Sequence, residues 1–176
     1  LFELALRFRM PLVLFSEGGG GRPGDDDLGP GVSFDTHTFT QFSKLSGSVP
    51  MIGVNHGRCF AGNTVLLACC DVIIATVDST IGMGGPAMIE GGGLGVYTPE
   101  EVGPMSFQVV NGVVDILVED EVEAVAVAKK YLSYFQGAVD SWESPDQLSL
   151  RHMIPENRLR LYDMRDIIAT IADVDS

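Results

Sequence analysis

The sequence predicts an α/β domain built on a parallel sheet, and three observations support this fold class. Residues 49–55 and 72–76 are short, predominantly apolar runs, as in strands that are buried on both faces. The small residues Ala61 and Gly62 turn the chain into a short apolar helix between these runs. A strand, a turn, a helix and a strand in this order form a βαβ unit with parallel strands. Ligands of such folds bind at the carboxyl ends of the strands.

The residues before this unit predict a helix, a strand and a second helix. Residues 1–9 carry apolar side chains at the spacing of an amphipathic helix. Pro11 ends that helix because proline cannot continue the helical hydrogen bonds. Residues 12–15 are a short continuous apolar run, typical of a strand in a parallel sheet. Residues 34–45 place aromatic and apolar side chains roughly along one side and predict a helix.

Beyond the central unit, the sequence predicts a strand at 113–118 and amphipathic helices at 120–136 and 164–171. The helix at 120–136 begins with acidic residues, ends with lysines and has Gly137 as its C-cap. Its expected apolar face consists of Val125, Ala128, Leu132 and Phe135. Residues 81–83 predict a short extended piece, and the glycine-rich residues 84–95 predict either a mobile loop or the wall of a site. Residues 98–101 predict the start of a helix, and residues 138–154 predict an irregular linker.

Length and composition exclude several classes of protein. A chain of 176 residues with 45% hydrophobic and 20% charged residues has the composition of one globular domain. Its net charge of −13 argues against a nucleic-acid partner, which would require a basic face. No apolar run reaches the roughly 20 residues that span a bilayer, so no membrane partner is expected. Because the chain begins with Leu1 rather than methionine, we expect it to be a piece of a longer protein.

The three cysteines, Cys59, Cys69 and Cys70, lie in or beside the apolar helix. We interpret them as small packing side chains rather than as a metal or redox site. No pair of histidines or cysteines has the spacing of metal ligands, so no metal is expected. The absence of a C-x-x-C pair favours a reducing, cytoplasmic setting.

Four consecutive glycines, Gly18 to Gly21, follow the first predicted strand. The run takes part in a G-x-G-x-x-G match, but Pro23 cannot enter the helix that a dinucleotide motif opens, and the aspartates at 25–27 would repel a pyrophosphate. Without Cβ atoms, the run can bring backbone N–H groups close to a ligand, with a flexible loop as the alternative. At the turn formed by Ala61 and Gly62, the N–H groups at the start of the helix have no partner inside the helix. They can face a developing oxyanion.

Side chains suited to acid–base chemistry are few near these turns. The sequence contains no G-x-S-x-G elbow, which argues against a Ser/His/Asp triad. We interpret His56 as structural rather than as a base, and Cys59 as packed rather than as a nucleophile. Glu90 is the one acid nominated for a hydratase-like reaction. A site rich in backbone donors suits stabilisation of a thioester enolate, with the proton acceptor supplied from elsewhere.

The segment 57–63, with 70–73 downstream, resembles the second oxyanion segment of the crotonase (ClpP/crotonase) superfamily. Within that superfamily the sequence is most similar to the carboxyltransferase (beta) subunit of biotin-dependent acyl-CoA carboxylases. The similarity covers nearly the whole chain, and further segments resemble the family in the same order: 18–22, 85–89, 98–103, 111–115, 120–124 and 155–165. Two positions depart from the family, whose members usually carry a small residue at Asn63 and often a histidine near Gln108.

The resemblance implies a crotonase-like (ββα spiral) N-terminal domain at 1–140, truncated at its start, and a linker with the start of a C-terminal domain at 141–176. It implies transfer of CO₂ from carboxybiotin to the α-carbon of an acyl-CoA of the acetyl- or propionyl-CoA type. In this family biotin, on a partner carrier domain, also supplies the nitrogen that accepts the α-proton. The thioester oxygen would be held by the backbone N–H groups of Gly20, Gly21, Ala61 and Gly62.

The resemblance also implies substrate contacts and partners. Residues expected to bind substrate are Gly19, Arg22, Arg58, Cys59, Phe60, Gly84, Gly85 and Pro86. Expected partners are acyl-CoA, biotin carboxyl carrier and biotin carboxylase components, and further copies of the full-length protein in a homo-oligomer. The second domain would supply the other half of the site, so the isolated fragment is expected to be inactive. Two alternatives stay open: another crotonase-superfamily acyl-CoA enzyme, such as a hydratase or hydrolase, and a non-catalytic crotonase-like interaction domain.

Overall fold

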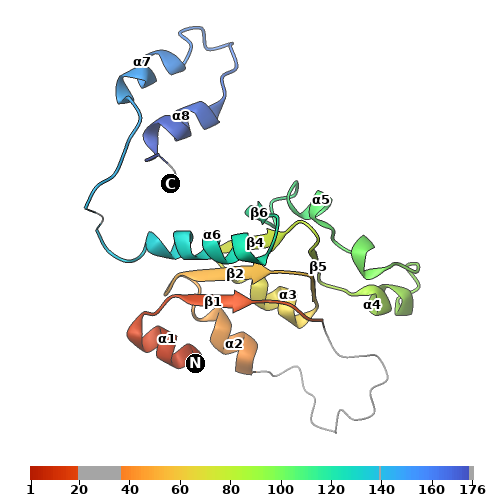
Figure 1. Ribbon diagram of the computed structural model, residues 1–176. Coiled ribbons are helices and arrows are strands. Elements are labelled where there is room, and N and C mark those ends of the chain that lie inside the picture. Colours follow the sequence, from red (N-terminus) through yellow and green to blue (C-terminus); the bar gives the residue numbers. More distant parts are fainter. Residues whose placement is uncertain (20–36, 139, 175–176) are drawn as a thin grey trace. The chain divides into compact units, whose positions relative to one another are not determined.

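Four parallel strands form the main sheet of the chain (Figure 1). The computed structural model describes residues 1–19, 37–138 and 140–174. In spatial order the strands are β1 (Leu12–Phe15), β2 (Met51–Asn55), β4 (Val72–Thr76) and β6 (Ile116–Val118). All three neighbouring pairs are parallel, with Ile52 opposite Val72 in the pair β2–β4. The predicted α/β class is confirmed, and so is the βαβ unit, in which the helix between β2 and β4 starts at Gly62.

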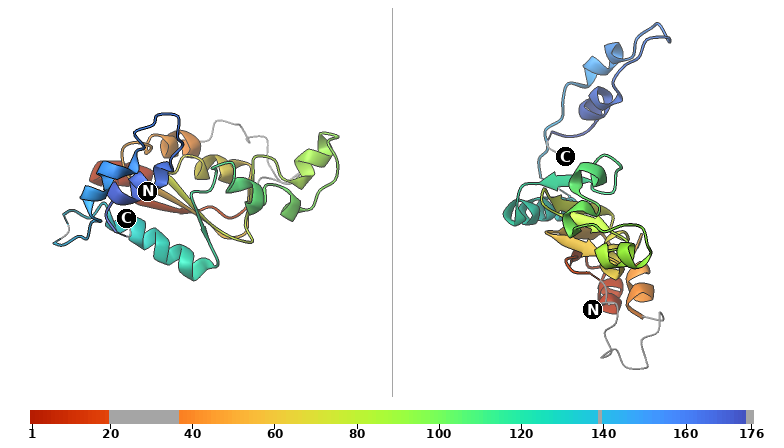
Figure 2. Two further views of the ribbon diagram at one scale, coloured as in Figure 1. Left: turned by 90° about the horizontal axis from the view of Figure 1, so that it is seen from above. Right: turned by 90° about the vertical axis from the view of Figure 1, so that its right-hand side faces the viewer.

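Helices cover both faces of this sheet (Figure 2). α6 (Glu121–Ser133) packs on one face, where Ala124 and Ala128 contact the buried side chains of Ile52, Val54, Val72, Ile74 and Val118. The other face carries α1 (Phe2–Phe8), α2 (His37–Ser43) and α3 (Gly62–Leu67). Successive side chains of a strand point to opposite faces, so Met51 faces away from α6 and packs with Phe42 and Leu45.

A second, two-stranded parallel sheet follows the carboxyl end of β2. It pairs β3 (Arg58–Phe60) with β5 (Thr80–Gly82), and Cys59 lies opposite Ile81. The strand β3 was not predicted, because the sequence places it inside a turn. Three short helical segments come after β5: α4 (Pro86–Gly91), the 3₁₀ turn η1 (Pro99–Glu101) and α5 (Met105–Gln108). Within the glycine-rich stretch 84–95, interpreted as a mobile loop or the wall of a site, residues 86–91 form α4.

Two further expectations need correction. The helix predicted at 120–136 ends at Ser133, with Tyr134 rather than Gly137 at its C-cap. Phe135 lies beyond the helix and is 51% exposed, so it does not belong to the buried face of α6. Ala124 and Ala128 form that face because their small side chains let the helix axis approach the sheet closely. The packing role expected for the cysteines is confirmed, since Cys59 is fully buried and the half-buried Cys69 and Cys70 pack against the core under α1 and α2.

The chain divides into two compact units, residues 1–136 and 137–176. The second unit contains η2 (Gln147–Ser149), α7 (Leu150–Met153) and α8 (Met164–Ile171). Within it, the Gln147 side chain donates to the Thr170 carbonyl, and the Val174 N–H donates to the Glu143 carbonyl at 2.8 Å. Across the described parts of the chain, no helix has both the length and the apolar character needed to cross a bilayer.

Candidate functional site

The two glycine-containing segments meet beside β3. The Gly18 N–H donates to the Arg58 carbonyl at 2.8 Å, and the Phe60 N–H donates to the Gly18 carbonyl at 2.9 Å. Gly18 therefore lies in register with Cys59, although 41 positions separate them in the sequence. The start of the glycine run is thereby brought to the segment that leads into α3. The predicted residues Gly20, Gly21 and Arg22 lie outside the described residues, so their roles stay predictions.

The turn into α3 has an unusual backbone at Ala61. This residue has φ 53° and ψ −123°, and its N–H donates to the Gly82 carbonyl at 3.2 Å. Gly62 is the first residue of α3, so its N–H has no acceptor inside the helix. The predicted role of the Ala61 N–H as an oxyanion donor is therefore wrong, because this N–H already donates to β5. The Gly62 N–H is the donor at this turn that the helix does not use.

Phe60 lies between the first glycine run and the segment after β5. A Cβ atom added to Gly19 would lie 3.2 Å from the Phe60 Cβ, and one added to Gly85 would lie 3.5 Å from its Cδ2. Phe60 itself is buried, with 8% of its surface exposed. Gly84 precedes Gly85, and Pro86 starts α4. Residues predicted to bind substrate from three distant parts of the sequence are therefore neighbours in space.

A buried polar network supports the turn between β2 and β3, and sequence reasoning missed it. The Asn55 side chain donates to the Gly57 carbonyl at 3.0 Å, and the Ser79 hydroxyl donates to the Asn55 carbonyl at 3.0 Å. The Gly57 N–H donates back to the Ser79 hydroxyl at 3.1 Å, and the Ser16 hydroxyl donates to the Asn55 Oδ1 at 3.0 Å. A polar residue at the end of an otherwise apolar strand, as at Asn55, is the one signal that the sequence offers.

The acidic and basic side chains of this region are paired with one another. Nδ1 and Nε2 of His56 each lie 3.0 Å from a carboxylate oxygen, of Glu17 and of Glu121 respectively. Arg58, which is predicted to bind substrate, is exposed and forms an ion pair with Glu100 of η1. These contacts agree with a structural role for His56 and leave neither ring nitrogen free to act as a base.

The two remaining candidates for side-chain chemistry have unsuitable surroundings. Burial raises the pKa of the Cys59 thiol above its ordinary value of 9.0, against opposing hydrogen bonds from Thr64 and Ser16. The thiol therefore stays protonated at neutral pH, which disfavours a nucleophilic role. Glu90 lies exposed on α4. Among the described residues, no group of three or more His, Cys, Asp and Glu side chains could hold a metal ion.

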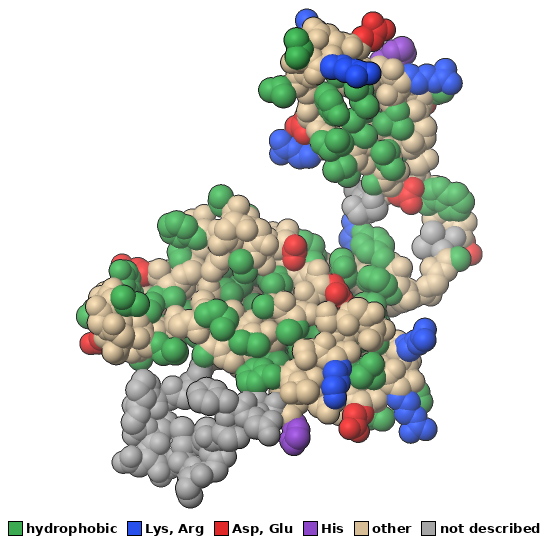
Figure 3. All heavy atoms as spheres, turned by 180° about the vertical axis from the view of Figure 1, so that it is seen from behind, with side chains coloured by type: hydrophobic (Ala, Val, Ile, Leu, Met, Phe, Trp, Pro, Cys, Tyr) green, Lys and Arg blue, Asp and Glu red, His purple; other side chains and the backbone are tan. Residues whose placement is uncertain are grey.

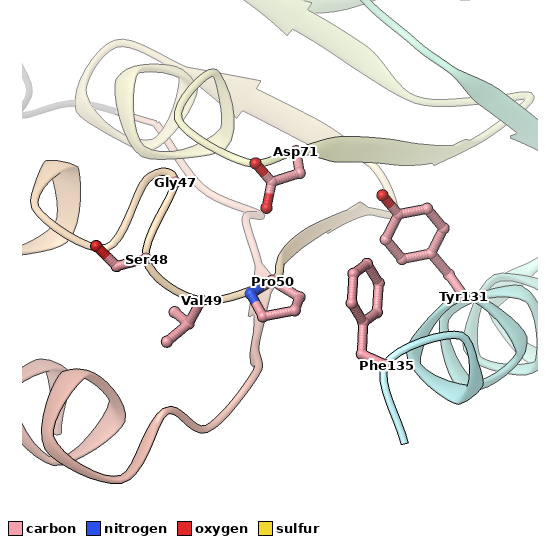
Figure 4. A pocket seen from close by; sticks show the side chains of 7 residues that line it. All are labelled: Gly47, Ser48, Val49, Pro50, Asp71, Tyr131 and Phe135. Atoms are coloured by element: carbon pink, nitrogen blue, oxygen red, sulfur yellow. The ribbon is translucent and has the colours of Figure 1, made fainter. Parts of the chain in front are cut away.

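A pocket of about 330 Å³ lies at the opposite ends of the strands (Figure 4). Pro50 and Asp71 directly precede β2 and β4, and Tyr131 and Phe135 face them from α6 and the residues after it. Its lining is completed by Gly47, Ser48 and Val49. None of the predicted site residues lines this pocket, so it is separate from the site at the carboxyl ends.

Comparison with known proteins places the chain among carboxyltransferases. It is 32% identical over 183 residues to the methylmalonyl-CoA carboxyltransferase 12S subunit of Propionibacterium freudenreichii subsp. shermanii, covering 97% of this chain and 34% of that protein. The chain spans about a third of the length of the curated relatives it matches.

Solved structures agree with this relation. A single-chain, multi-domain long-chain acyl-CoA carboxylase matches with a TM-score of 0.83 and 57% identity, over 99% of this chain and 17% of that one. The transcarboxylase 12S crystal structure, a hexamer assembly with methylmalonyl-coenzyme A bound, matches with a TM-score of 0.71 and 29% identity, over 97% of this chain and 35% of that one. These neighbours confirm the crotonase-like fold. Because the model of the carboxyl transferase domain matches residues 2–176, the chain belongs to the carboxyl transferase domain family.

Proposed function

We propose that this chain forms the acyl-CoA half-site of the carboxyltransferase component of a biotin-dependent acyl-CoA carboxylase. The reaction transfers CO₂ from carboxybiotin to the α-carbon of an acyl-CoA. The observation that carries the proposal is the pairing of Gly18 with Cys59, which brings the start of the glycine run next to the strand that leads into the turn at Ala61 and Gly62. Membership of the carboxyl transferase domain family supports the same reaction class.

In this proposal the thioester oxygen accepts hydrogen bonds from both turns. Removal of the α-proton moves negative charge onto that oxygen, so fixed N–H donors stabilise the enolate more than the ground state. The donors are the N–H of Gly62 on one side and those of Gly20 and Gly21 on the other. Ala61 contributes through its backbone conformation, since its own N–H donates to Gly82.

The residues around the turns fit a reaction whose proton acceptor is not a side chain of this chain. His56, Glu17 and Glu121 are paired with one another, and the Cys59 thiol is buried. Biotin, when bound, supplies both the CO₂ and the nitrogen that accepts the α-proton. This chain then has to bind the thioester, orient its α-carbon and stabilise the enolate oxygen. The residues proposed for binding the rest of acyl-CoA are Gly19, Arg22, Arg58, Phe60, Gly84, Gly85 and Pro86. Cys59, which the resemblance also selects, has no exposed surface and supports the site from the interior instead.

The length of the acyl chain has two candidates. The resemblance to carboxyltransferase subunits favours substrates of the acetyl- or propionyl-CoA type, and the 12S relative acts on methylmalonyl-CoA by its name. The 57% identity to a long-chain acyl-CoA carboxylase favours a long acyl chain instead. A panel from acetyl-CoA to palmitoyl-CoA, assayed with the full-length protein, separates these two candidates.

We further propose that the chain acts within a larger, cytoplasmic assembly with biotin carboxyl carrier and biotin carboxylase components and with further copies of itself. Large hydrophobic side chains are exposed along residues 83–113, among them Met83, Met88, Leu94, Val96, Phe107 and Val110. In Figure 3, hydrophobic side chains are scattered over the larger part of the chain, with charged side chains between and around them. Apolar surface of this kind is typical of a protein interface.

The test of the oxyanion role compares Gly62→Pro with Gly62→Ala in the full-length protein. Both variants place a Cβ about as close to Phe39, 3.0 Å from its Cζ, but only proline removes the N–H. Proline is tolerated at the first position of a helix, but it also restricts the residue before it. A crystal structure of Gly62→Pro therefore has to show that Ala61 keeps its φ of 53° and ψ of −123°. We expect Gly62→Pro to lower kcat by about 10²–10³-fold, as the loss of one oxyanion donor does. Gly62→Ala should keep most of the activity, and circular dichroism confirms that both variants fold.

Three outcomes would contradict the proposal. Equal kcat values for the two variants would show that the Gly62 N–H is no oxyanion donor. Hydration of an enoyl-CoA that disappears in Glu90→Gln would favour the hydratase alternative. A wild-type protein that carboxylates no acyl-CoA and gives no heat of binding with millimolar CoA or acetyl-CoA would favour the non-catalytic interaction domain.

A further inference from the structure

Asn63 connects the two glycine-containing turns through its side chain. Its Nδ2 donates to the Glu17 carbonyl at 2.8 Å and lies 3.2 Å from the Ser16 carbonyl, which it also reaches as a donor. An Asn amide nitrogen carries two hydrogens, one for each of these carbonyl oxygens. The contacts cross 46 and 47 positions of the sequence. Asn63 directly follows Gly62, so one residue joins the second turn to the backbone that leads into the glycine run.

Because Gly18 has no side chain, the Asn63 amide can pack directly against its backbone. Its φ is +121°, a conformation that side-chain-bearing residues rarely adopt, and a Cβ placed on it would lie 2.7 Å from the Asn63 Nδ2. Any other residue at position 18 would therefore push the amide away. The glycine and the asparagine are matched to each other.

The contacts of Asn63 fix the orientation of the peptide planes before the glycine run. A trans peptide carries its C=O and N–H on opposite edges. In the peptide that joins Glu17 to Gly18, the carbonyl accepts from Asn63 and the N–H donates to the Arg58 carbonyl at 2.8 Å. Both edges are held, one by a side chain of α3 and the other by β3. The next peptide, which joins Gly18 to Gly19, has its carbonyl held by the Phe60 N–H, so Asn63 and β3 together hold the backbone that enters the glycine run.

We propose that Asn63 is a positioning residue that fixes the backbone of residues 16–19, where the glycine run begins, relative to the turn at Ala61 and Gly62. The inference rests on the proposed function, in which one thioester oxygen meets donors from both turns. Without the Asn63 amide, β3 still pairs with Gly18, so the fold persists. The carbonyls of Ser16 and Glu17 would then turn to water, and residues 16–19 would lose the contact that ties them to α3. Such a change weakens the transition state more than the binding of the CoA moiety.

The experiment compares Asn63→Ala and Asn63→Asp with the wild type in the full-length carboxylase. Asparagine and aspartate have nearly the same shape, but an ionised carboxylate cannot donate to two carbonyls. We expect kcat to fall by about 10–100-fold in both variants, while KM for the best acyl-CoA of the panel changes by less than about threefold. Hydrogen exchange read by mass spectrometry should become faster in peptides that contain residues 16–19. Asn63 is half-buried, and circular dichroism of both variants checks that they fold.

Asn111→Ala is the matched control. Its side-chain amide donates to the Gln108 Oε1 at 2.9 Å in an exposed turn, and we expect wild-type kcat and unchanged exchange at 16–19. A kcat of Asn63→Ala within about twofold of wild type would overturn the inference, as would a raised KM at unchanged kcat. If the wild type carboxylates no acyl-CoA, the proposed function fails. The exchange rates of residues 16–19 still decide in that case whether Asn63 fixes this backbone, because they do not depend on turnover.

Discussion

Two buried regions adjoin each other in the main sheet and are held by different interactions. The interior between the sheet and α6 is apolar, and Ile52, Val54 and Ile74 are at most 2% exposed there. At the carboxyl ends of β2 and β4, one residue beyond Val54 and two beyond Ile74, the buried side chains are polar. Asn55 and Thr76 have no exposed surface, and Ser79 has 2%.

The apolar region mainly stabilises the fold, whereas the polar region mainly fixes the geometry of the backbone. Apolar burial contributes about 25 cal/mol for each Å² removed from water and has no preferred direction. A buried polar group contributes little net free energy, but it requires a partner at a defined distance and angle. The polar network of Asn55 and Ser79 therefore fixes the backbone at Gly57, and with it the start of β3. The apolar interior supplies the rigid sheet from which these turns extend.

The largest expected effect is the loss of stability in Ile74→Ala. Ile74 is completely buried under α6, so its truncation leaves a cavity and should cost about 2–5 kcal/mol of unfolding free energy. Urea unfolding of the chain, followed by circular dichroism, measures this cost. Leu117→Ala on the neighbouring strand β6 is the control, because Leu117 is 43% exposed and should cost less than about 1 kcal/mol. A similar cost for both variants would contradict an apolar interior as the main source of stability.

A smaller loss of stability with a larger loss of activity is expected for Ser79→Ala. The variant leaves the Gly57 N–H and the Asn55 carbonyl without their buried partner, which should cost about 1–3 kcal/mol. Because the turn before β3 is then free to move, kcat of the full-length protein should fall further than in Ile74→Ala at a temperature where both are folded. Ser133→Ala removes an exposed hydroxyl that donates to the Lys130 carbonyl and should change neither quantity measurably.

The same two regions differ in how far the sequence predicts them. The apolar runs at 49–55 and 72–76 predict β2, β4 and their parallel pairing, because burial on both faces leaves a continuous apolar signal. The two-stranded sheet escapes prediction. The three residues of β3 pair with Gly18 on one side and with β5 on the other, and this pairing follows from tertiary contacts alone.

At the site, the glycine and small residues could be recognised in the sequence, but their supports could not. The resemblance to carboxyltransferases selects Gly19, Phe60 and Gly85, and the structure brings these three together. Ser79 in the sequence is an ordinary turn residue, and its contact with Asn55 depends on where β4 ends relative to β2. Phe135 shows the opposite error: helical spacing places it on the buried face of α6, but the helix ends before reaching it.

The smallest expected effect is a pH dependence at the edge of the polar network. The Thr76 hydroxyl donates to the Asp78 carboxylate at 2.6 Å and lowers the pKa of Asp78 below its ordinary value of 3.8, with a minor contribution from His56. The unfolded chain therefore binds a proton more readily at this position than the folded chain. The stabilising contribution is present above the ordinary pKa and is lost as the pH falls through the lower pKa of the folded state.

Asp78→Asn isolates this contribution, because asparagine keeps an acceptor for Thr76 but does not titrate. We expect the difference in unfolding free energy between wild type and Asp78→Asn to stay constant above about pH 5. Below about pH 4, the unfolding free energy of the wild type should fall relative to that of Asp78→Asn, because only the wild type loses a charge-assisted hydrogen bond. Urea unfolding at a series of pH values measures both curves, and subtracting them cancels every other titrating group. A difference that stays constant down to about pH 2.5 would show that the Thr76 hydroxyl does not distinguish the charged carboxylate from the neutral amide.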